Sequence, residues 1–179
     1  MMHSTPSPSN RPVWSPRRIA FSAMLAALAL IFSYIEAIFP FYTGIPGVKL
    51  GLANLVVVVA LYKMSPAYAV TINVVRVLMA GLLFSGLFGM VYSLAGSLCS
   101  FLVMYLLWRS GLFSVLGVSL AGGVFHNLGQ LAVAALAVSN ARIFLYFPVL
   151  IFSGMAAGII VGIGSFVLIS RLPDQIFRT

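Results

Sequence analysis

Six long apolar runs, separated by short polar stretches, restrict the folds open to this chain more than any other feature. The runs span residues 19–39, 48–62, 67–84, 87–108, 112–138 and 143–169. A helix of about 20 apolar residues crosses a hydrocarbon core of about 30 Å, so most of the runs are long enough to span a membrane. Only 7% of the residues are charged, whereas soluble domains have about a quarter. We therefore expect an all-α, polytopic integral membrane protein with six transmembrane helices.

The runs divide the chain into three parts. Residues 1–18 are rich in Ser, Pro and Asn and are expected to form a disordered cytoplasmic tail. Residues 19–170 are expected to form the six-helix transmembrane domain, and residues 171–179 a short cytoplasmic tail. Six spans use almost the whole chain, which leaves no room for a soluble catalytic domain.

The positions of the cations predict the orientation. With the N-terminus inside, seven of the ten Lys and Arg residues fall on the cytoplasmic side: Arg11, Arg17, Arg18, Lys63, Arg109, Arg171 and Arg178. Lys49 and Arg142 fall outside, and Arg76 falls within a span. This bias predicts a multi-pass protein of the cell (inner or cytoplasmic) membrane with both termini cytoplasmic. Because the cations are scattered and form no patch, we expect no nucleic-acid partner.

The second run opens with a proline, two glycines four residues apart and a lysine: Pro46, Gly47, Gly51 and Lys49. We expect a helix over residues 48–62 with one face bare of side chains at the two glycines. At 1.5 Å per residue it is about 22 Å long, too short for the hydrocarbon core. Irregular backbone before a helix that starts inside a membrane is tolerated where it lines a wet cavity, so we expect a cavity here. The alternative is a short, little-tilted helix whose Lys49 reaches the surface.

Four ionisable residues lie within or at the ends of the spans: Glu36, Lys49, Arg76 and His126. Such a residue costs about 2.5 to 3.5 kcal/mol near the middle of a span, so each is a functional candidate. All four fall in the middle or outer half of the bilayer in the expected topology, which predicts one outward-facing pocket. Two alternatives remain open: a buried salt bridge between Arg76 and Glu36, and a helix-to-helix hydrogen bond of His126.

Four amide side chains accompany these residues: Asn54, Asn73, Asn127 and Gln130. Asn73 lies three residues before Arg76, and Gln130 lies four after His126, so each pair shares a helix face. Asn54 lies about one turn into the second helix and can point into the same space. Structural hydrogen bonding is the alternative to ligand contact for these amides.

Two groups of glycines suggest different roles. Gly122 and Gly123 lie one turn before His126 and are expected to leave open space beside the polar groups. In the sixth run, Gly154, Gly158 and Gly162 repeat every four residues. Such a ridge favours close helix packing over ligand contact.

The expected pocket has a net positive charge. Lys49, Arg76 and also Arg142 would stand against Glu36 alone. The fork of an arginine suits a carboxylate or a phosphate. We therefore expect a small anionic or ring-bearing solute.

The sequence lacks the residues that several kinds of catalytic and metal-binding site require. No phosphate-binding loop of the G-x-x-x-x-G-K-[ST] type occurs, so ATP-driven transport would need partner subunits. The two acids, Glu36 and Asp174, cannot form a paired-carboxylate site or a cage for a divalent cation. Cys99 stands alone, which excludes an intrachain disulfide and a thiolate cluster. We expect no catalytic residues, no metal and no cofactor.

Several motifs resemble one known family. They are Pro46 to Asn54 (PGVKLGLAN), Asn73-Val-Val-Arg76 with Gly81, Ser93-Leu-Ala-Gly96, and Gly122 to Gln130 ending in HNLGQ. Together they resemble the Gx transporter family, which has the older label heptaprenyl diphosphate synthase component I, over about residues 20–168. The six-helix plan is similar to the S components of energy-coupling factor transporters. In those proteins a small-residue motif on the first helix contacts a coupling subunit, and Ala23 and Ala27 would be its counterpart. Packing within the chain is the alternative for these two alanines.

The resemblance and the residues lead to one first interpretation and two alternatives. The first is the substrate-binding membrane subunit of a transporter for a small solute, vitamin-like or anionic, with an S-component-like bundle. It would need a transmembrane coupling subunit and ATPases as partners. One alternative is a structural subunit of a larger membrane complex whose polar groups only bind helices together. The other is a non-catalytic membrane component associated with heptaprenyl diphosphate synthesis. The catalytic subunits of such synthases resemble proteins with two Asp-rich motifs, which a chain with one aspartate lacks.

Overall fold

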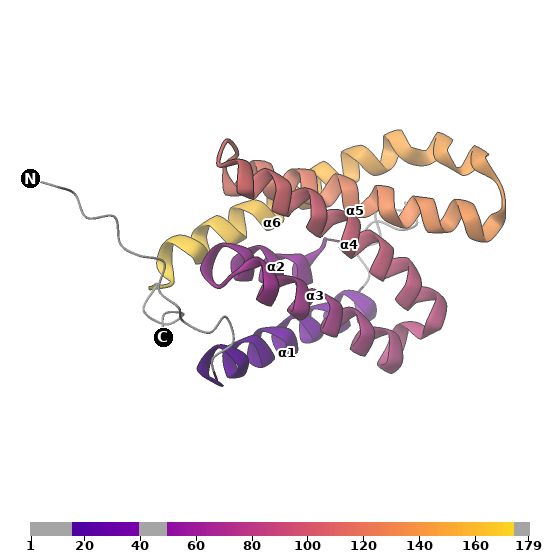
Figure 1. Cartoon of the computed structure of the whole chain (residues 1–179). Coiled ribbons are helices and arrows are strands. Elements are labelled where there is room, and N and C mark those ends of the chain that lie inside the picture. Colours follow the sequence, from indigo (N-terminus) through magenta and orange to yellow (C-terminus); the bar gives the residue numbers. More distant parts are fainter. Residues whose placement is uncertain (1–15, 40–49, 174–179) are drawn as a thin grey trace, which may run out of the picture.

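The described part of the protein is entirely helical. The structure is a computed structural model, and it describes residues 16–39 and 50–173. Its elements are α1 (Pro16–Ile38), α2 (Leu52–Lys63), α3 (Pro66–Ala80), the π-helix η1 (Gly81–Ser85), α4 (Gly86–Ser110), α5 (Val115–Val138), the 3₁₀-helix η2 (Ala141–Tyr146) and α6 (Phe147–Arg171). The expected all-α class is confirmed for these residues. In Figure 1, α1, α2 and α3 form one part of the bundle, and α4, α5 and α6 lie beside them.

Helix α2 lies at the centre of the bundle. It packs against α1, α3 and α6, and residues 56–61 are all buried. At 1.5 Å per residue its 12 residues extend about 18 Å. A short helix that is apolar on all sides suits a buried position, because its neighbours shield it from the surroundings.

The start of α2 differs from the expected position. The helix begins at Leu52 and not at Val48, because Gly51 has the left-handed conformation (φ +75°) and precedes the first turn. We expected Gly51 to share a bare helix face with Gly47. This expectation is wrong, because Gly51 precedes the helix. Pro46, Gly47 and Lys49 lie outside the described residues.

Other boundaries also shift by a few residues. Helix α1 begins at Pro16, three residues before the expected start of the first helix at Ile19. The expected third helix, residues 67–84, ends as an α-helix at Ala80 and continues as the π-helix η1. Gly86 then has φ +70°, and the chain reverses so that α3 and α4 pack side by side (Figure 1).

The glycine ridge of α6 packs against α5, as expected. A Cβ at Gly158 would lie 2.6 Å from the Cα of Leu120, and one at Gly162 would lie 3.1 Å from the Cα of Leu116. A Cβ at Gly154 would lie 2.8 Å from the carbonyl oxygen of Gly123. Glycine lets the two backbones approach at these places.

The open space expected at Gly122 and Gly123 is found only in part: Gly123 borders the cavity described below, but both glycines pack tightly against neighbouring helices. A Cβ at Gly122 would lie 2.6 Å from the Sδ atom of Met104 in α4. One at Gly123 would collide with the carbonyl oxygen of Gly154 in α6. The two glycines let α5 pack closely against a helix on each side.

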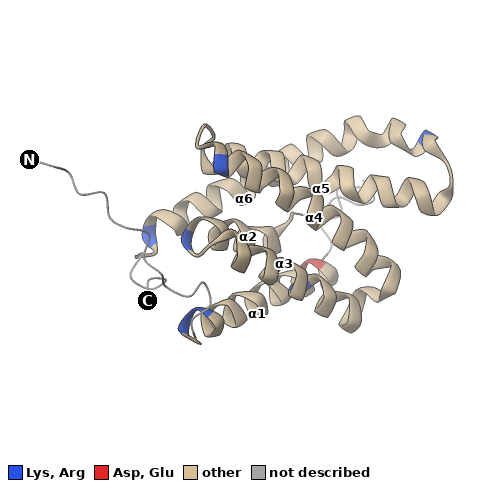
Figure 2. Cartoon of the chain, in the orientation of Figure 1, with Lys and Arg blue, Asp and Glu red and all other residues tan. Residues whose placement is uncertain are grey.

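The length and the surface of the helices support a membrane protein. Four described helical stretches are long and apolar enough to cross a membrane: residues 16–38, 66–110, 115–138 and 141–171. The outward faces carry large apolar side chains, among them Leu82, Leu87, Leu136 and Leu145. Figure 2 shows most described Lys and Arg residues at the end of the bundle where α1 begins and α6 ends. The α5–α6 connection, which contains Arg142, carries a cation at the opposite end.

Candidate binding cavity

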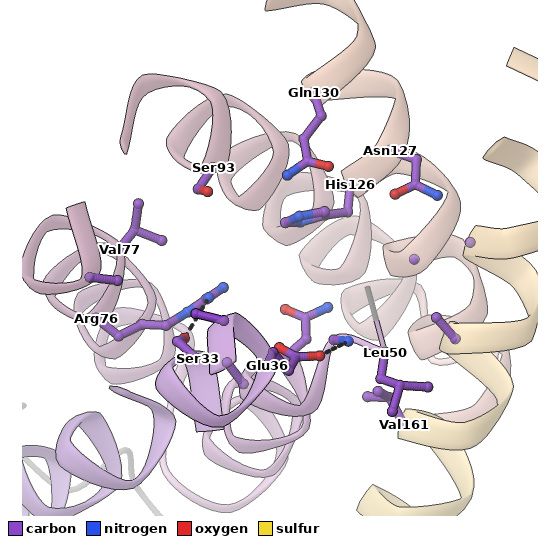
Figure 3. Close-up of a pocket in the computed structure, with 18 of the residues that line it drawn as sticks. Ser33, Glu36, Leu50, Arg76, Val77, Ser93, His126, Asn127, Gln130 and Val161 are labelled. Atoms are coloured by element: carbon purple, nitrogen blue, oxygen red, sulfur yellow. Dashed lines mark hydrogen bonds between the residues drawn. The ribbon is translucent and has the colours of Figure 1, made fainter. Parts of the chain in front are cut away.

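One cavity lies where all six helices meet. It has a volume of about 160 Å³, and residues of every α-helix and of η1 line it (Figure 3). Phe84 of η1 forms part of the wall and contacts the ring of Tyr34 in α1, with ring centroids 5.6 Å apart. A cavity that draws on every helix matches the expected convergence of polar residues from distant parts of the chain.

Most of the expected site residues line this cavity. They are Glu36, Asn54, Arg76, His126, Asn127 and Gln130. Asn73 is buried behind the wall, and Lys49 lies outside the described residues. Polar groups on membrane helices turn toward one another because the hydrocarbon layer offers them no hydrogen bonds. Ligand binding by these residues stays a prediction.

Arg76 reaches the cavity from α3 with the support of two neighbours. Its Nη2 donates a hydrogen bond to Oδ1 of Asn73 (2.9 Å). Its Nη1 donates a longer, weaker hydrogen bond to the Oγ of Ser33 (3.5 Å). The Nδ2 of Asn73 donates to the carbonyl oxygen of Ser97 in α4 (3.2 Å), which fixes the amide orientation. The Nε of Arg76 is buried and has no hydrogen-bond partner among the described residues. Asn73 is thus a positioning residue for Arg76.

Glu36 binds the start of α2. Its Oε1 accepts hydrogen bonds from the backbone N–H groups of Gly51 (2.6 Å) and Leu52 (3.2 Å). A carboxylate at a helix N-terminus satisfies free N–H groups and interacts favourably with the helix dipole. Glu36 and Arg76 form no ion pair with each other, so the salt bridge considered above is absent from the structure.

The charge of the described cavity differs from the expected positive one. Arg76 and Glu36 are the only Lys, Arg, Asp or Glu residues among the described lining. Arg142 lies in η2, is exposed and does not line the cavity. The described lining therefore carries one positive and one negative charge.

The polar side chains that α5 contributes to the cavity include one imidazole and two amides: His126, Asn127 and Gln130. In Figure 3, His126 and Gln130 face the cavity opposite Arg76 and Glu36. Gln130 is buried, and no hydrogen bond joins its amide to another described residue. Asn127 is different, because its Nδ2 donates to the carbonyl oxygen of Leu150 (2.8 Å) and to Ser153 (3.2 Å) in α6. Asn127 therefore links two helices as well as lining the cavity.

Sequence reasoning missed four serines that line the cavity: Ser33, Ser85, Ser93 and Ser119. Ser33 lies one turn before Glu36, and Ser119 lies seven residues before His126, so helical spacing could have found both. The Oγ of Ser119 donates to the carbonyl oxygen of Gly158 (2.9 Å). Ser85 depends on the π-helix, which no pattern in the sequence indicated.

Two further expectations concern the outside of the bundle and metal binding. Ala23 and Ala27 are exposed on α1, so a partner helix can reach them, and contact with a coupling subunit stays a prediction. Residues 16–39 and 50–173 contain no group of three or more His, Cys, Asp or Glu residues that could hold a metal ion.

Comparison with known proteins places the chain in a family. The family model described as heptaprenyl diphosphate synthase component I matches residues 25–168. No curated protein and no solved structure gives a significant match. Because the matched residues are most of the chain and include every helix that lines the cavity, the chain belongs to the heptaprenyl diphosphate synthase component I family.

Proposed function

We propose that this protein is the substrate-binding membrane subunit of a transporter for a small polar solute. The observation that carries the proposal is a cavity at the centre of an apolar helical bundle, lined by polar groups that have no hydrogen-bond partner among the described residues. The protein would have six spans and both termini in the cytoplasm, and it would reside in the cell membrane. It would bind the solute and rely on partner subunits for energy.

The free hydrogen-bonding capacity of the cavity supports a ligand. The Oδ1 of Asn54 and the Nε of Arg76 are buried and have no hydrogen-bond partner among the described residues. Leaving one buried polar group unsatisfied costs about 1 to 3 kcal/mol. The amide of Gln130 adds further donors and an acceptor. A polar solute would satisfy these groups together, whereas a purely structural network would pair them with one another.

The distribution of cations supports the proposed topology. Arg17 and Arg18 stand in the first turn of α1, and Lys63, Arg109 and Arg171 stand in the last turns of α2, α4 and α6. An excess of Lys and Arg marks the cytoplasmic side. Six spans require α2, about 18 Å long, to begin inside the hydrocarbon layer and to reach the cytoplasmic side at Lys63. The cap that Glu36 provides makes such a start favourable, since it satisfies N–H groups that lipid would not.

Partner subunits would supply the energy in this proposal. In this proposal the protein acts like an S component, and the exposed Ala23 and Ala27 on α1 would allow a coupling helix to approach closely. Extraction under mild conditions followed by affinity purification tests this point. Copurification of a coupling subunit and ATPases supports the proposal, and their absence argues for a role outside this transporter class.

A second candidate function is a non-catalytic membrane component of heptaprenyl diphosphate synthesis. The description of the family favours it. The cavity favours the first candidate, because about 160 Å³ with one arginine suits a small solute better than a long isoprenoid chain with a diphosphate. A diphosphate is usually held by several cations or by a metal ion.

Native mass spectrometry of the protein, extracted gently from its own membrane, tests the two candidates against each other. A retained water-soluble small molecule that is lost in Arg76→Ala supports solute binding. Arg142→Ala is the matched control, because Arg142 lies outside the cavity, and it should retain the molecule. A retained polyprenyl diphosphate supports the second candidate. A protein that carries neither contradicts the first proposal.

A further inference from the structure

The cavity contains a cation and an anion that form no hydrogen bond or ion pair with each other. Arg76 enters from α3 and Glu36 from α1, and both line the same space. Figure 3 shows the two side chains reaching the cavity with separate hydrogen-bond partners. Arg76 is held by Asn73 and Ser33, and Glu36 is held by the start of α2. Opposite charges that share a cavity in a membrane would gain from direct contact, so their separate anchoring leaves each charge able to bind another group.

Both charged groups retain unused hydrogen-bonding capacity. A guanidinium has five N–H donors, and the structure uses one on Nη1 and one on Nη2. The buried Nε of Arg76 is among those left over. On Glu36, Oε1 accepts both backbone hydrogen bonds, and Oε2 accepts none from the described residues. The cavity thus offers a donor set for an anionic group and an acceptor for a cationic one.

The remaining polar lining suits a neutral middle part of a ligand. Asn54 presents a buried Oδ1 without a partner, and the amide of Gln130 lies across the cavity from Arg76 and Glu36 (Figure 3). Neither residue carries a charge. Both amides line the same cavity as Arg76 and Glu36, so they are available to the uncharged part of a bound molecule.

From this arrangement we infer that the solute is amphoteric: a small molecule with an acidic group for Arg76 and a basic group for Glu36. This inference rests on the proposed function and names the class of substrate. The electrostatic reason is that the described lining has no net charge, and burying a net charge away from water is costly unless it is paired. An amphoteric solute pairs both charges of the described lining and adds no net charge to it. A simple anion would pair Arg76 and leave Glu36 beside another negative charge.

Three probes that share one benzene ring test the inference: benzoate, benzylamine and 4-(aminomethyl)benzoate. Their binding to the purified full-length protein in detergent micelles is measured by equilibrium dialysis at millimolar concentration. We expect the amphoteric probe to bind roughly tenfold or more tightly than either singly charged probe, which corresponds to about 1.4 kcal/mol or more. Equal or tighter binding of benzoate overturns the inference and leaves a solute-binding function standing.

Two variants connect the preference to the cavity. Glu36→Gln keeps a side-chain oxygen for the start of α2 but removes the charge, so it should erase the preference over benzoate. Arg76→Gln should erase the preference over benzylamine. Each ratio is measured within one variant, so a partial loss of folded protein does not change it. A preference that survives in both variants overturns the inference, as does failure of all three probes to bind, while native mass spectrometry decides the proposed function separately.

Discussion

A single methyl group at Gly158 is predicted to disturb the contact between α5 and α6. A Cβ there would lie 2.6 Å from the Cα of Leu120 and 2.9 Å from the carbonyl oxygen of Ser119. Both are backbone atoms, so no side chain can rotate away, and the helices must separate until the contact reaches about 3.4 Å. The hydrogen bond from Oγ of Ser119 to the carbonyl oxygen of Gly158 (2.9 Å) would weaken as they separate.

The expected loss of stability follows from three contributions. Overpacking costs about 1 to 3 kcal/mol, and the weakened hydrogen bond costs about 1 kcal/mol. Replacing a helical glycine by alanine recovers about 1 kcal/mol of helix propensity. Gly158→Ala should therefore lower the free energy of unfolding by about 1 to 3 kcal/mol. SDS-induced unfolding in mixed micelles measures it, and ligand retention should also fall because Gly158 and Ser119 line the cavity.

Gly117→Ala is the matched control in the same helix pair. A Cβ at Gly117 would have its nearest neighbour at 3.6 Å, in the side chain of Phe113, which is ordinary contact. This variant should be neutral or more stable by less than about 1 kcal/mol. The reasoning is refuted if Gly158→Ala unfolds at the wild-type SDS concentration, or if the two variants lose the same stability.

Three other predictions test the site and the topology. Glu36→Ala removes the hydrogen-bond acceptor at the start of α2 and should lower the free energy of unfolding by about 1 to 3 kcal/mol. Hydrogen–deuterium exchange of the Leu52 amide should accelerate, and unchanged exchange would contradict the capping role of Glu36. Asn73→Ala removes the shortest hydrogen bond of Arg76 and should weaken ligand retention about tenfold (about 1.4 kcal/mol) while the helical circular dichroism spectrum stays unchanged. In a background without the native cysteine, Ser110→Cys should resist a membrane-impermeant maleimide in intact cells, and Asn140→Cys should react. The opposite pattern would reverse the proposed orientation.

The sequence alone predicted the class of protein and the residues that gather in the cavity. Long apolar runs with few charges leave helices in a membrane as the main solution, since backbone groups in lipid must bond within the segment. The cost of a polar group in lipid also makes Glu36, Arg76 and His126 turn inward, although they stand on three different helices. Convergence was therefore predictable without any knowledge of how the helices pack.

Contacts between distant residues decided the details that the sequence left open. The start of α2 at Leu52 depends on the φ of Gly51 and on Glu36, which lies 15 residues away along the chain. Glycine lacks a Cβ whether it borders a cavity or a neighbouring helix, so the sequence could not distinguish the two roles of Gly122 and Gly123. The same limit applies to Arg76: its spacing allowed a salt bridge or a ligand contact. The tertiary structure shows that Asn73 and Ser33 hold its guanidinium, while Glu36 binds the start of α2. The choice of partner depends on distances between helices, which residue spacing along one helix does not give.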